Sequence, residues 1–278
     1  MTRGRAGFTF IELIVVAVVG SLILFAALQV LITNRRMFTA QSATISGQQS
    51  TRMAVEILFA ELREVSPGGG DIISMASDEI RVRLMRKFAS VCAITYSPQP
   101  LLLVFHPTPS SRKFHTGDSI FAWADNEENV ETDDVWIPAR VTAVDSFTTA
   151  VGLPVCPQDL APASLLTFNG QAAAFEADSV RVGAPVRSYI EYTFGVTNLM
   201  GDPYLGRQTQ SGPMVPIAGP LRTGNGLQFT YRDSLGTVTN VPTDVRQIEV
   251  TVRTGSRVLN SLGQMVSDSV TIWIHSRN

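Results

Sequence analysis

The carboxylate of Glu12 is the side chain with the clearest chemical consequence, because it lies inside an apolar run, Phe8-Thr9-Phe10-Ile11-Glu12-Leu13-Ile14-Val15-Val16, that follows Gly7. Burying a lone carboxylate in hydrocarbon is costly, so a carboxylate at membrane depth needs a partner. If the chain were cut between Gly7 and Phe8, the new α-amino group would lie four residues before Glu12, and a neighbouring subunit could present its own amine to this carboxylate. Alternatively, Glu12 lies at the headgroup boundary, where a helix N-terminus favours a negative charge. The residues alone leave both readings open.

The two cysteines, Cys92 and Cys156, are a second candidate for chemistry. An even pair in an oxidising compartment can form a disulfide. The alternative is that the two cysteines are unrelated buried thiols, because two cysteines are too few to form a disulfide framework in a protein of this size.

The three histidines, His106, His115 and His275, have no metal-ligand spacing and no nucleophile motif near them. We therefore expect ordinary surface or sheet residues. The sequence predicts no enzyme and no cofactor.

An acidic segment offers oxygen ligands of the kind that calcium prefers. Its spacing lacks the core of an EF-hand, and charge runs are usually solvated, so we favour a hairpin loop over a metal site. The carboxylates are those of Asp125, Glu127, Glu128, Glu131, Asp133 and Asp134.

A basic cluster, Arg81, Arg83, Arg86 and Lys87, has the charge needed to contact phosphates. The net charge of the 278 residues is only −2, however, and gives no sign of a polyanionic partner. We favour the charged outer face of an edge strand, where basic residues block aggregation, and expect no nucleic-acid binding.

The element that must carry Glu12 is a membrane-spanning helix. Leu13 to Ile32 contains no charged side chain, and twenty residues span a bilayer as a helix. Arg3 and Arg5 precede the span and favour the cytoplasmic side, although Arg35 and Arg36 follow it. We expect everything after Ile32 to lie outside the cytoplasm.

The helix is predicted to continue beyond the span, because no proline occurs between residues 33 and 66. Ala54, Leu58, Leu62 and Val65 recur at helical spacing and should pack against the rest of the protein. The run that begins with Pro67 and three glycines should end the helix near Ser66.

Beyond residue 71 the sequence alternates between apolar and polar residues in short runs separated by turn residues, which predicts β-strands. The fold class is therefore α+β, a long N-terminal helix on an antiparallel β-rich head. The predicted strands are Glu79–Leu84, Leu101–His106, Ser119–Trp123, Val135–Val144, Val186–Phe194, Leu227–Arg232, Gln247–Arg253 and Ser269–Ile274.

The basic leader, Gly7, Phe8 and Glu12, followed by an unbroken apolar helix, resemble the class III signal sequence of type IV pilins and type II secretion pseudopilins. The resemblance implies a prepilin peptidase that cleaves after Gly7 and methylates the new N-terminus of Phe8. It also implies that Glu12 aligns subunits during assembly. Residues 22 to 32 lack the proline of many major pilins.

The resemblance divides the chain into a leader (1–7), a transmembrane and assembly segment (8–32), an amphipathic helical segment (33–66) and an extracytoplasmic head (67–278). It implies a single-pass protein of the bacterial inner membrane that reaches a pilus or the cell surface after assembly. The implied partners are the peptidase, an inner-membrane assembly platform, and other pilins and minor pilins.

Two passages of the head, one beginning at Tyr189 and one at Leu227, resemble large minor pilins of the PilW type and secretion pseudopilins of the GspJ type. We expect a minor pilin that primes or caps a filament. The alternatives are a minor pseudopilin, a membrane-anchored binding protein and, last, an anchored hydrolase. Which machine the chain serves, what its head binds and its position in the filament stay open.

Overall fold

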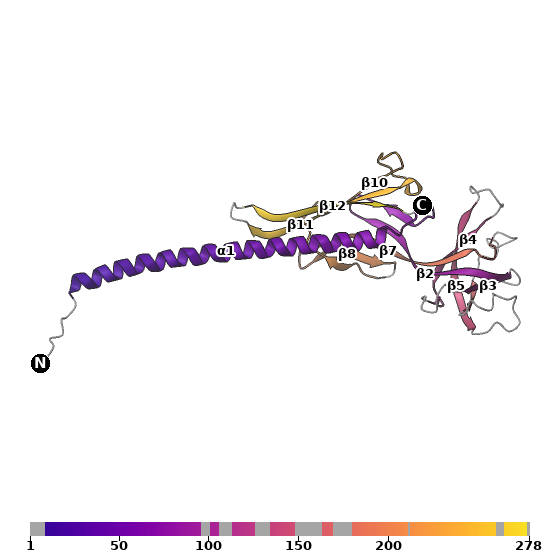
Figure 1. The fold of residues 1–278 in the computed structure, drawn as a ribbon, viewed down its shortest axis with the longest axis horizontal. Helices are drawn as coiled ribbons and strands as arrows, with labels where there is room; N and C mark the ends of the chain where they lie inside the picture. Colours follow the sequence, from indigo (N-terminus) through magenta and orange to yellow (C-terminus); the bar gives the residue numbers. More distant parts are fainter. Residues whose placement is uncertain are drawn as a thin grey trace.

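The structure is a computed structural model that describes residues 9–95, 101–105, 113–125, 134–147, 163–168, 180–210, 212–259 and 264–276. A long helix, α1 (Phe10–Leu62), projects from an antiparallel β head, which confirms the predicted α+β architecture (Figure 1). The first half of α1 extends away from the head, and the second half lies along it.

Helix α1 ends at Leu62, four residues before the predicted Ser66. The N–H of Val65 donates to the carbonyl of Leu62 (3.2 Å), which tightens the chain after the last turn. The next free N–H, that of Ser66, donates to Oδ2 of Asp71 (3.0 Å) instead of continuing the helix. Pro67 disfavours helical geometry at the residue before it, so the chain turns here.

The predicted apolar stripe of α1 is confirmed. Ala54, Leu58 and Leu62 of α1, and Val65 just after it, are fully buried against the head, whereas Phe59, the neighbour of Leu58, is 43% exposed. The second half of α1 is therefore a structural part of the head.

The described residues of the head form two sheets, and all eight predicted strands are present. The nine-stranded sheet comprises β1 (Ile72–Met75), β2 (Ile80–Thr95), β3 (Leu101–Phe105), β4 (Ser119–Ala124), β5 (Val135–Phe147), β6 (Ala163–Phe168), β7 (Pro185–Leu199), β8 (Asp202–Thr209) and β9 (Val215–Ala218). The three-stranded sheet comprises β10 (Leu227–Arg232), β11 (Gln247–Leu259) and β12 (Met265–His275), with a 3-10 turn, η2 (Pro242–Asp244), between β10 and β11. The prediction did not include β1, β6, β8 and β9.

Six strands close into a barrel at the end of the molecule farthest from the helix N-terminus (Figure 1). Each strand pairs antiparallel with the next in the order β2, β3, β6, β5, β4, β7, and β7 pairs with β2 again. Closure leaves these strands no free edge over the paired residues. The interior is filled by buried side chains that include Val91, Leu102, Ile120, Leu166 and Phe168.

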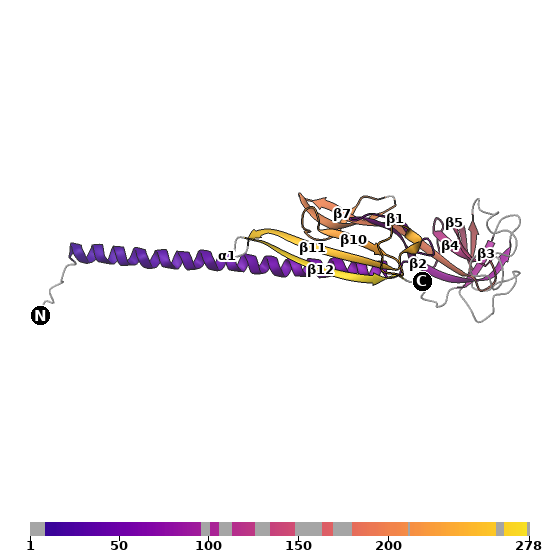
Figure 2. The ribbon, with the colours of Figure 1, turned by 90° about the horizontal axis from the view of Figure 1, so that it is seen from above.

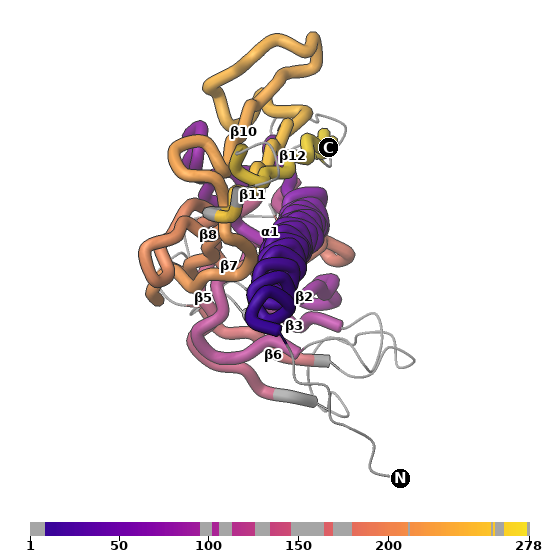
Figure 3. The backbone as a smooth tube through the Cα atoms, turned by 90° about the vertical axis from the view of Figure 1, so that its left-hand side faces the viewer, coloured from indigo at the N-terminus to yellow at the C-terminus, as the bar shows by residue number. Residues whose placement is uncertain are grey.

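A second core lies between α1 and the two sheets, on the side of the barrel that faces the N-terminal half of α1. Figure 3 shows α1 running beside strands of both sheets. This core includes the buried stripe of α1 together with Ile80, Phe194, Leu205 and Val250. Strands β2 and β7 are long enough to line both cores: their pairing runs from Ile80 with Phe194 in this core to Ser90 with Pro185 in the barrel. The barrel is thus joined to the helix by two continuous strands.

Candidate functional site

The start of α1 brings Thr9 and Glu12 together in a capping box. The backbone N–H and the hydroxyl of Thr9 donate to Oε2 of Glu12 (3.0 and 3.1 Å), and the N–H of Glu12 donates to the Thr9 hydroxyl (3.3 Å). This exchange satisfies N–H groups that have no partner within the helix. Gly7 and Phe8, the predicted processing residues, lie outside the described residues.

The apolar segment of α1 has no cover from the rest of the described chain. Every residue from Thr9 to Thr39 is exposed, and none of the most apolar 18-residue window is buried. The helix is long and apolar enough to cross a membrane. Contiguous exposed apolar surface of this size requires lipid or other protein around it.

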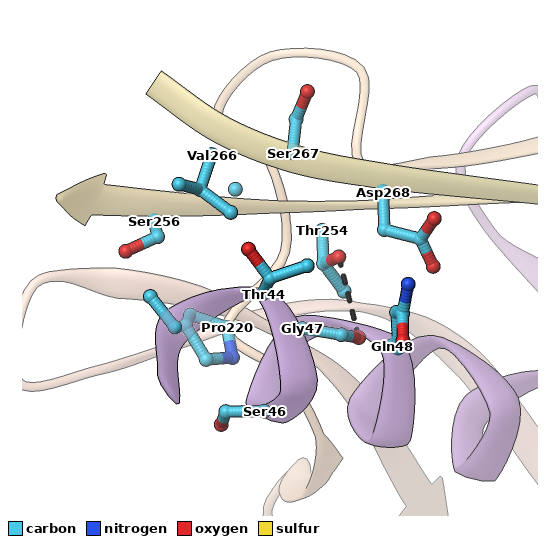
Figure 4. Close-up of a pocket in the computed structure, with 12 residues that line it drawn as sticks. Thr44, Ser46, Gly47, Gln48, Pro220, Thr254, Ser256, Val266, Ser267 and Asp268 are labelled. Atoms are coloured by element: carbon cyan, nitrogen blue, oxygen red, sulfur yellow. Dashed lines mark hydrogen bonds between the residues drawn. The ribbon is translucent and has the colours of Figure 1, made fainter. Parts of the chain in front are cut away.

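The helix meets the head through polar contacts where it first touches it (Figure 4). The hydroxyls of Thr51 and Thr254 lie 3.0 Å apart, and the Thr254 hydroxyl also donates to the carbonyl of Gly47 (3.4 Å). Ser50 donates to the carbonyl of Gly219 (2.7 Å). A small cavity of about 110 Å³ lies beside them between α1, β11 and β12. Its lining is that of a helix-to-sheet seam and includes Thr44, Gln48, Ser256 and Asp268.

A buried ion pair joins the end of the helix to the barrel, and sequence reasoning missed it. Arg187 on β7 donates to both carboxylate oxygens of Asp71 (2.9 Å each), and its guanidinium lies 4.3 Å from the ring centroid of Trp136 and 5.1 Å from that of Phe121. Burial raises the pKa of the Asp71 carboxyl, while the charge of Arg187 opposes that rise. The contacts fix the barrel against the chain that leaves α1.

The acidic segment is only partly described. Asp125 forms an ion pair with Arg181 (3.5 Å), and Asp134 is the only other described member. Glu127, Glu128, Glu131 and Asp133 lie outside the described residues. Among the residues that the structure does describe, no group of three His, Cys, Asp or Glu side chains could hold a metal ion.

The basic cluster is bound to acidic side chains rather than free for phosphates. Arg81 and Arg83 pair with Glu191 (2.7 and 3.4 Å), Arg86 pairs with Glu61 (2.9 Å), and Lys87 pairs with Asp118 (2.5 Å). The expectation of an edge strand holds for part of the cluster: β2 pairs with β7 along one side, whereas on its other side β1 reaches only Ile80–Val82 and β3 begins at Ser90. The charges serve as cross-links between β2 and its neighbours.

Cys92 is disulfide-bonded, and its Sγ lies 3.3 Å from the carbonyl oxygen of Leu103. Cys156, the predicted partner, lies outside the described residues, so the pairing stays a prediction.

Of the histidines, His115 accepts a hydrogen bond from Nζ of Lys87 at Nδ1 (2.9 Å), and its backbone N–H donates to Asp118 (2.7 Å). His275 is exposed at the end of β12, and His106 lies outside the described residues. Neither described histidine lies in a pocket with a nucleophile.

No protein-family model matches the chain, and neither a curated protein nor a solved structure matches it. One long apolar N-terminal helix packed by its second half on an antiparallel β head is consistent with a pilin-like architecture and compatible with a single membrane span.

Proposed function

We propose that this chain is a minor type IV pilin, a structural subunit that primes or caps an extracytoplasmic filament after a prepilin peptidase has cut it between Gly7 and Phe8. The observation that carries the proposal is the division of α1 into two parts. Residues Thr9 to Thr39 are exposed and largely apolar, whereas the stripe from Ala54 to Leu62 is buried in the head. One helix thus serves as a membrane span before assembly and as an assembly surface afterwards.

The position of Glu12 supports this role. It lies in the first turn of the exposed apolar helix, where a cut before Phe8 would place an α-amino group close by. In a filament, a neighbouring amine would compensate the carboxylate that the apolar surroundings disfavour. In the single chain, the N–H and hydroxyl of Thr9 occupy this carboxylate instead.

The rigid connection from helix to barrel also supports a structural role. Two continuous strands and the buried Asp71–Arg187 pair hold the barrel at the far end of the molecule (Figure 1). A subunit at a filament tip would present such a barrel outward. A pseudopilin of type II secretion would share the same mechanism in another machine.

The deciding experiment is the mass and sequence of the N-terminus after expression with and without an active prepilin peptidase. We expect a chain that begins with N-methylated Phe8 only when the peptidase is present. An intact Met1 to Gly7 leader in both cells would overturn the proposal in favour of a membrane-anchored binding protein, because a simple anchor needs no such cut.

A further inference from the structure

We propose that the outer edge of β12 binds an extended strand from the head of a neighbouring, different subunit, and this inference rests on the proposed function. β12 is the last strand of the three-stranded sheet and pairs only with β11 within the described chain. Its other side offers backbone groups in the geometry that another strand requires.

The register identifies which backbone groups point to this edge. The N–H of Ser276 donates to the carbonyl of Arg246 (3.1 Å), and hydrogen-bonded pairs recur at every second residue of an antiparallel ladder. The N–H of Arg253 donates to the carbonyl of Gly226 (2.7 Å), on the side of β11 that faces β10. The backbone groups of Arg253 therefore point away from β12, as this alternation requires. The residues of β12 whose N–H and C=O groups point outward therefore include Ser267, Ser269, Thr271 and Trp273. No backbone hydrogen bond from the described residues reaches these groups.

The edge also lacks the features that normally prevent strand addition. β12 contains no proline, lysine or arginine, and its register with β11 is free of bulges from Gln247–His275 to Gly255–Ser267. Its one acidic residue, Asp268, lies among the core-facing positions and lines the cavity beside α1. Natural proteins blunt such edges with charge, proline or a bulge. The side chains that alternate with the core-facing ones carry no formal charge at neutral pH, and they are Met265, Ser267, Ser269, Thr271, Trp273 and His275. Met265 and Trp273 are 71% and 55% exposed.

Other edges among the described strands are short or covered. β1 and β9, the edges of the nine-stranded sheet, are four residues long, and β9 contains Pro216. On β10, at the opposite side of the same sheet, the N–H of Phe229 donates to Ser77 (2.7 Å) and the carbonyl of Tyr231 accepts from Thr239 (3.0 Å). The six barrel strands close on themselves. An open, regular edge of this length at β12 therefore stands apart and indicates a binding surface.

The direction of β12 decides which occupant fits. β12 runs beside α1 and in the same direction, from the membrane-proximal end of the head toward its far end (Figure 2). Antiparallel pairing of two copies through β12 would point their helices in opposite directions, and both could not enter one membrane. All described strand pairs of the head are antiparallel, and we infer the same arrangement at this edge. The added strand then comes from a different subunit, whose helix lies parallel to α1 and whose head has a strand that runs opposite to β12.

The test is site-specific photo-crosslinking in the full-length chain, expressed with its filament machinery. A benzophenone amino acid replaces Trp273, and the variants Ser269→Pro and Ser269→Ala are compared in that background. We expect an adduct with a different filament subunit, mapped to a strand of its head. Ser269→Pro removes an outward N–H but leaves the pairing with β11, so it should lower the adduct about tenfold, whereas Ser269→Ala should leave it within about twofold.

Amide hydrogen exchange on assembled and unassembled wild-type chains provides a test that needs no variant. Assembly should slow exchange at Ser267, Ser269, Thr271 and Trp273, because these N–H groups gain acceptors. Unchanged exchange at these four amides would overturn the inference, as would an adduct formed between two copies of this chain.

The N-terminus of the same preparations separates this inference from the proposed function. A chain processed at Phe8 that gives no β12 adduct would overturn the edge inference and leave the filament role intact. An unprocessed chain would overturn the filament role, and the neighbouring-subunit inference would fall with it.

Discussion

Arg187 and Asp71 face each other across the junction between the end of α1 and the barrel, with two contacts of 2.9 Å between guanidinium and carboxylate. Only 9% and 3% of these side chains are exposed. Asp71 also accepts the N–H of Ser66, and Arg187 donates to the carbonyl of Gly69 (3.3 Å). The pair therefore connects Ser66, just after α1, and the glycine run at Gly69 with strand β7.

Removing one member of this pair should destabilise the head strongly. Asp71→Ala leaves the buried Arg187 charge uncompensated, which typically costs about 3–5 kcal/mol of unfolding free energy. Denaturant unfolding of the detergent-solubilised chain, followed by tryptophan fluorescence, would measure it, since Trp136 contacts Arg187. Glu249→Ala, which breaks the more exposed pair with Arg232, is the control and should cost about 1 kcal/mol or less. Equal losses in the two variants would refute this account.

The glycine run after the helix should tolerate alanine at one position and reject it at the next. A Cβ on Gly69 would lie 2.9 Å from Nη2 of Arg187 and 3.4 Å from Cδ1 of Trp136, whereas a Cβ on Gly68 would meet nothing within 4 Å. Gly69→Ala should therefore cost about 1–3 kcal/mol by overpacking the ion pair. Gly68→Ala should be neutral or slightly stabilising, because it restricts only the unfolded chain. Thermal unfolding of both variants tests the contrast, which a loss at Gly68 would contradict.

Two adjacent residues of α1 should differ sharply in their importance for helix docking. Leu58 is fully buried and Phe59 is 43% exposed. Leu58→Ala should cost about 2–5 kcal/mol through lost burial and a cavity, whereas Phe59→Ala should cost less than about 1 kcal/mol. Unfolding free energies and proteolysis between helix and head would show the difference. Similar values would mean that the stripe does not anchor the helix.

Periodicity in the sequence predicted those parts of the fold that depend on local pattern. The α1 stripe follows from helical spacing, and the eight predicted strands follow from alternation and turn residues. Barrel closure could not be predicted in this way, because β2 and β7 are separated by about a hundred residues and alternation does not say which strands pair.

The same limit explains why the candidate site was predicted only in part. Glu12 is recognisable because a carboxylate in an apolar run is unusual on its own. Asp71 and Arg187 are 116 residues apart, and each is unremarkable in its local context, so only tertiary structure identifies the pair. The ion pairs of Arg81 and Arg83 were not predicted for the same reason, because their partner Glu191 lies far away in the sequence, on β7.

Alkaline pH should destabilise the head through Tyr231. Its hydroxyl donates to the carbonyl of Ala76 (3.0 Å), and burial raises the pKa of Tyr231 far above its usual value of about 10. Above about pH 10 the unfolded chain loses the phenolic proton of Tyr231, while the folded chain keeps it. The folded state then binds more protons, so the unfolding free energy falls as pH rises beyond about 10.

The variant Tyr231→Phe isolates this effect. At neutral pH it should cost about 1 kcal/mol for the lost hydrogen bond. Above about pH 10 its unfolding free energy should fall less steeply than that of the wild type, because no phenol remains at this position to ionise on unfolding. Denaturation at a series of pH values measures both slopes. Parallel slopes would show that Tyr231 ionises equally in the folded and unfolded chain.

The charge of Glu12, rather than its capping bonds, should decide filament incorporation. Glu12→Gln retains an acceptor for the N–H and hydroxyl of Thr9, because glutamine also completes a capping box, but it removes the negative charge. We expect processing at Phe8 and membrane insertion to be unchanged, and the amount in sheared filaments to fall about tenfold or more. Glu56→Gln, the same change on an exposed face of α1, is the control and should incorporate normally. If Glu12→Gln enters filaments as well as the wild type does, pairing between Glu12 and a neighbouring amine plays no part in assembly.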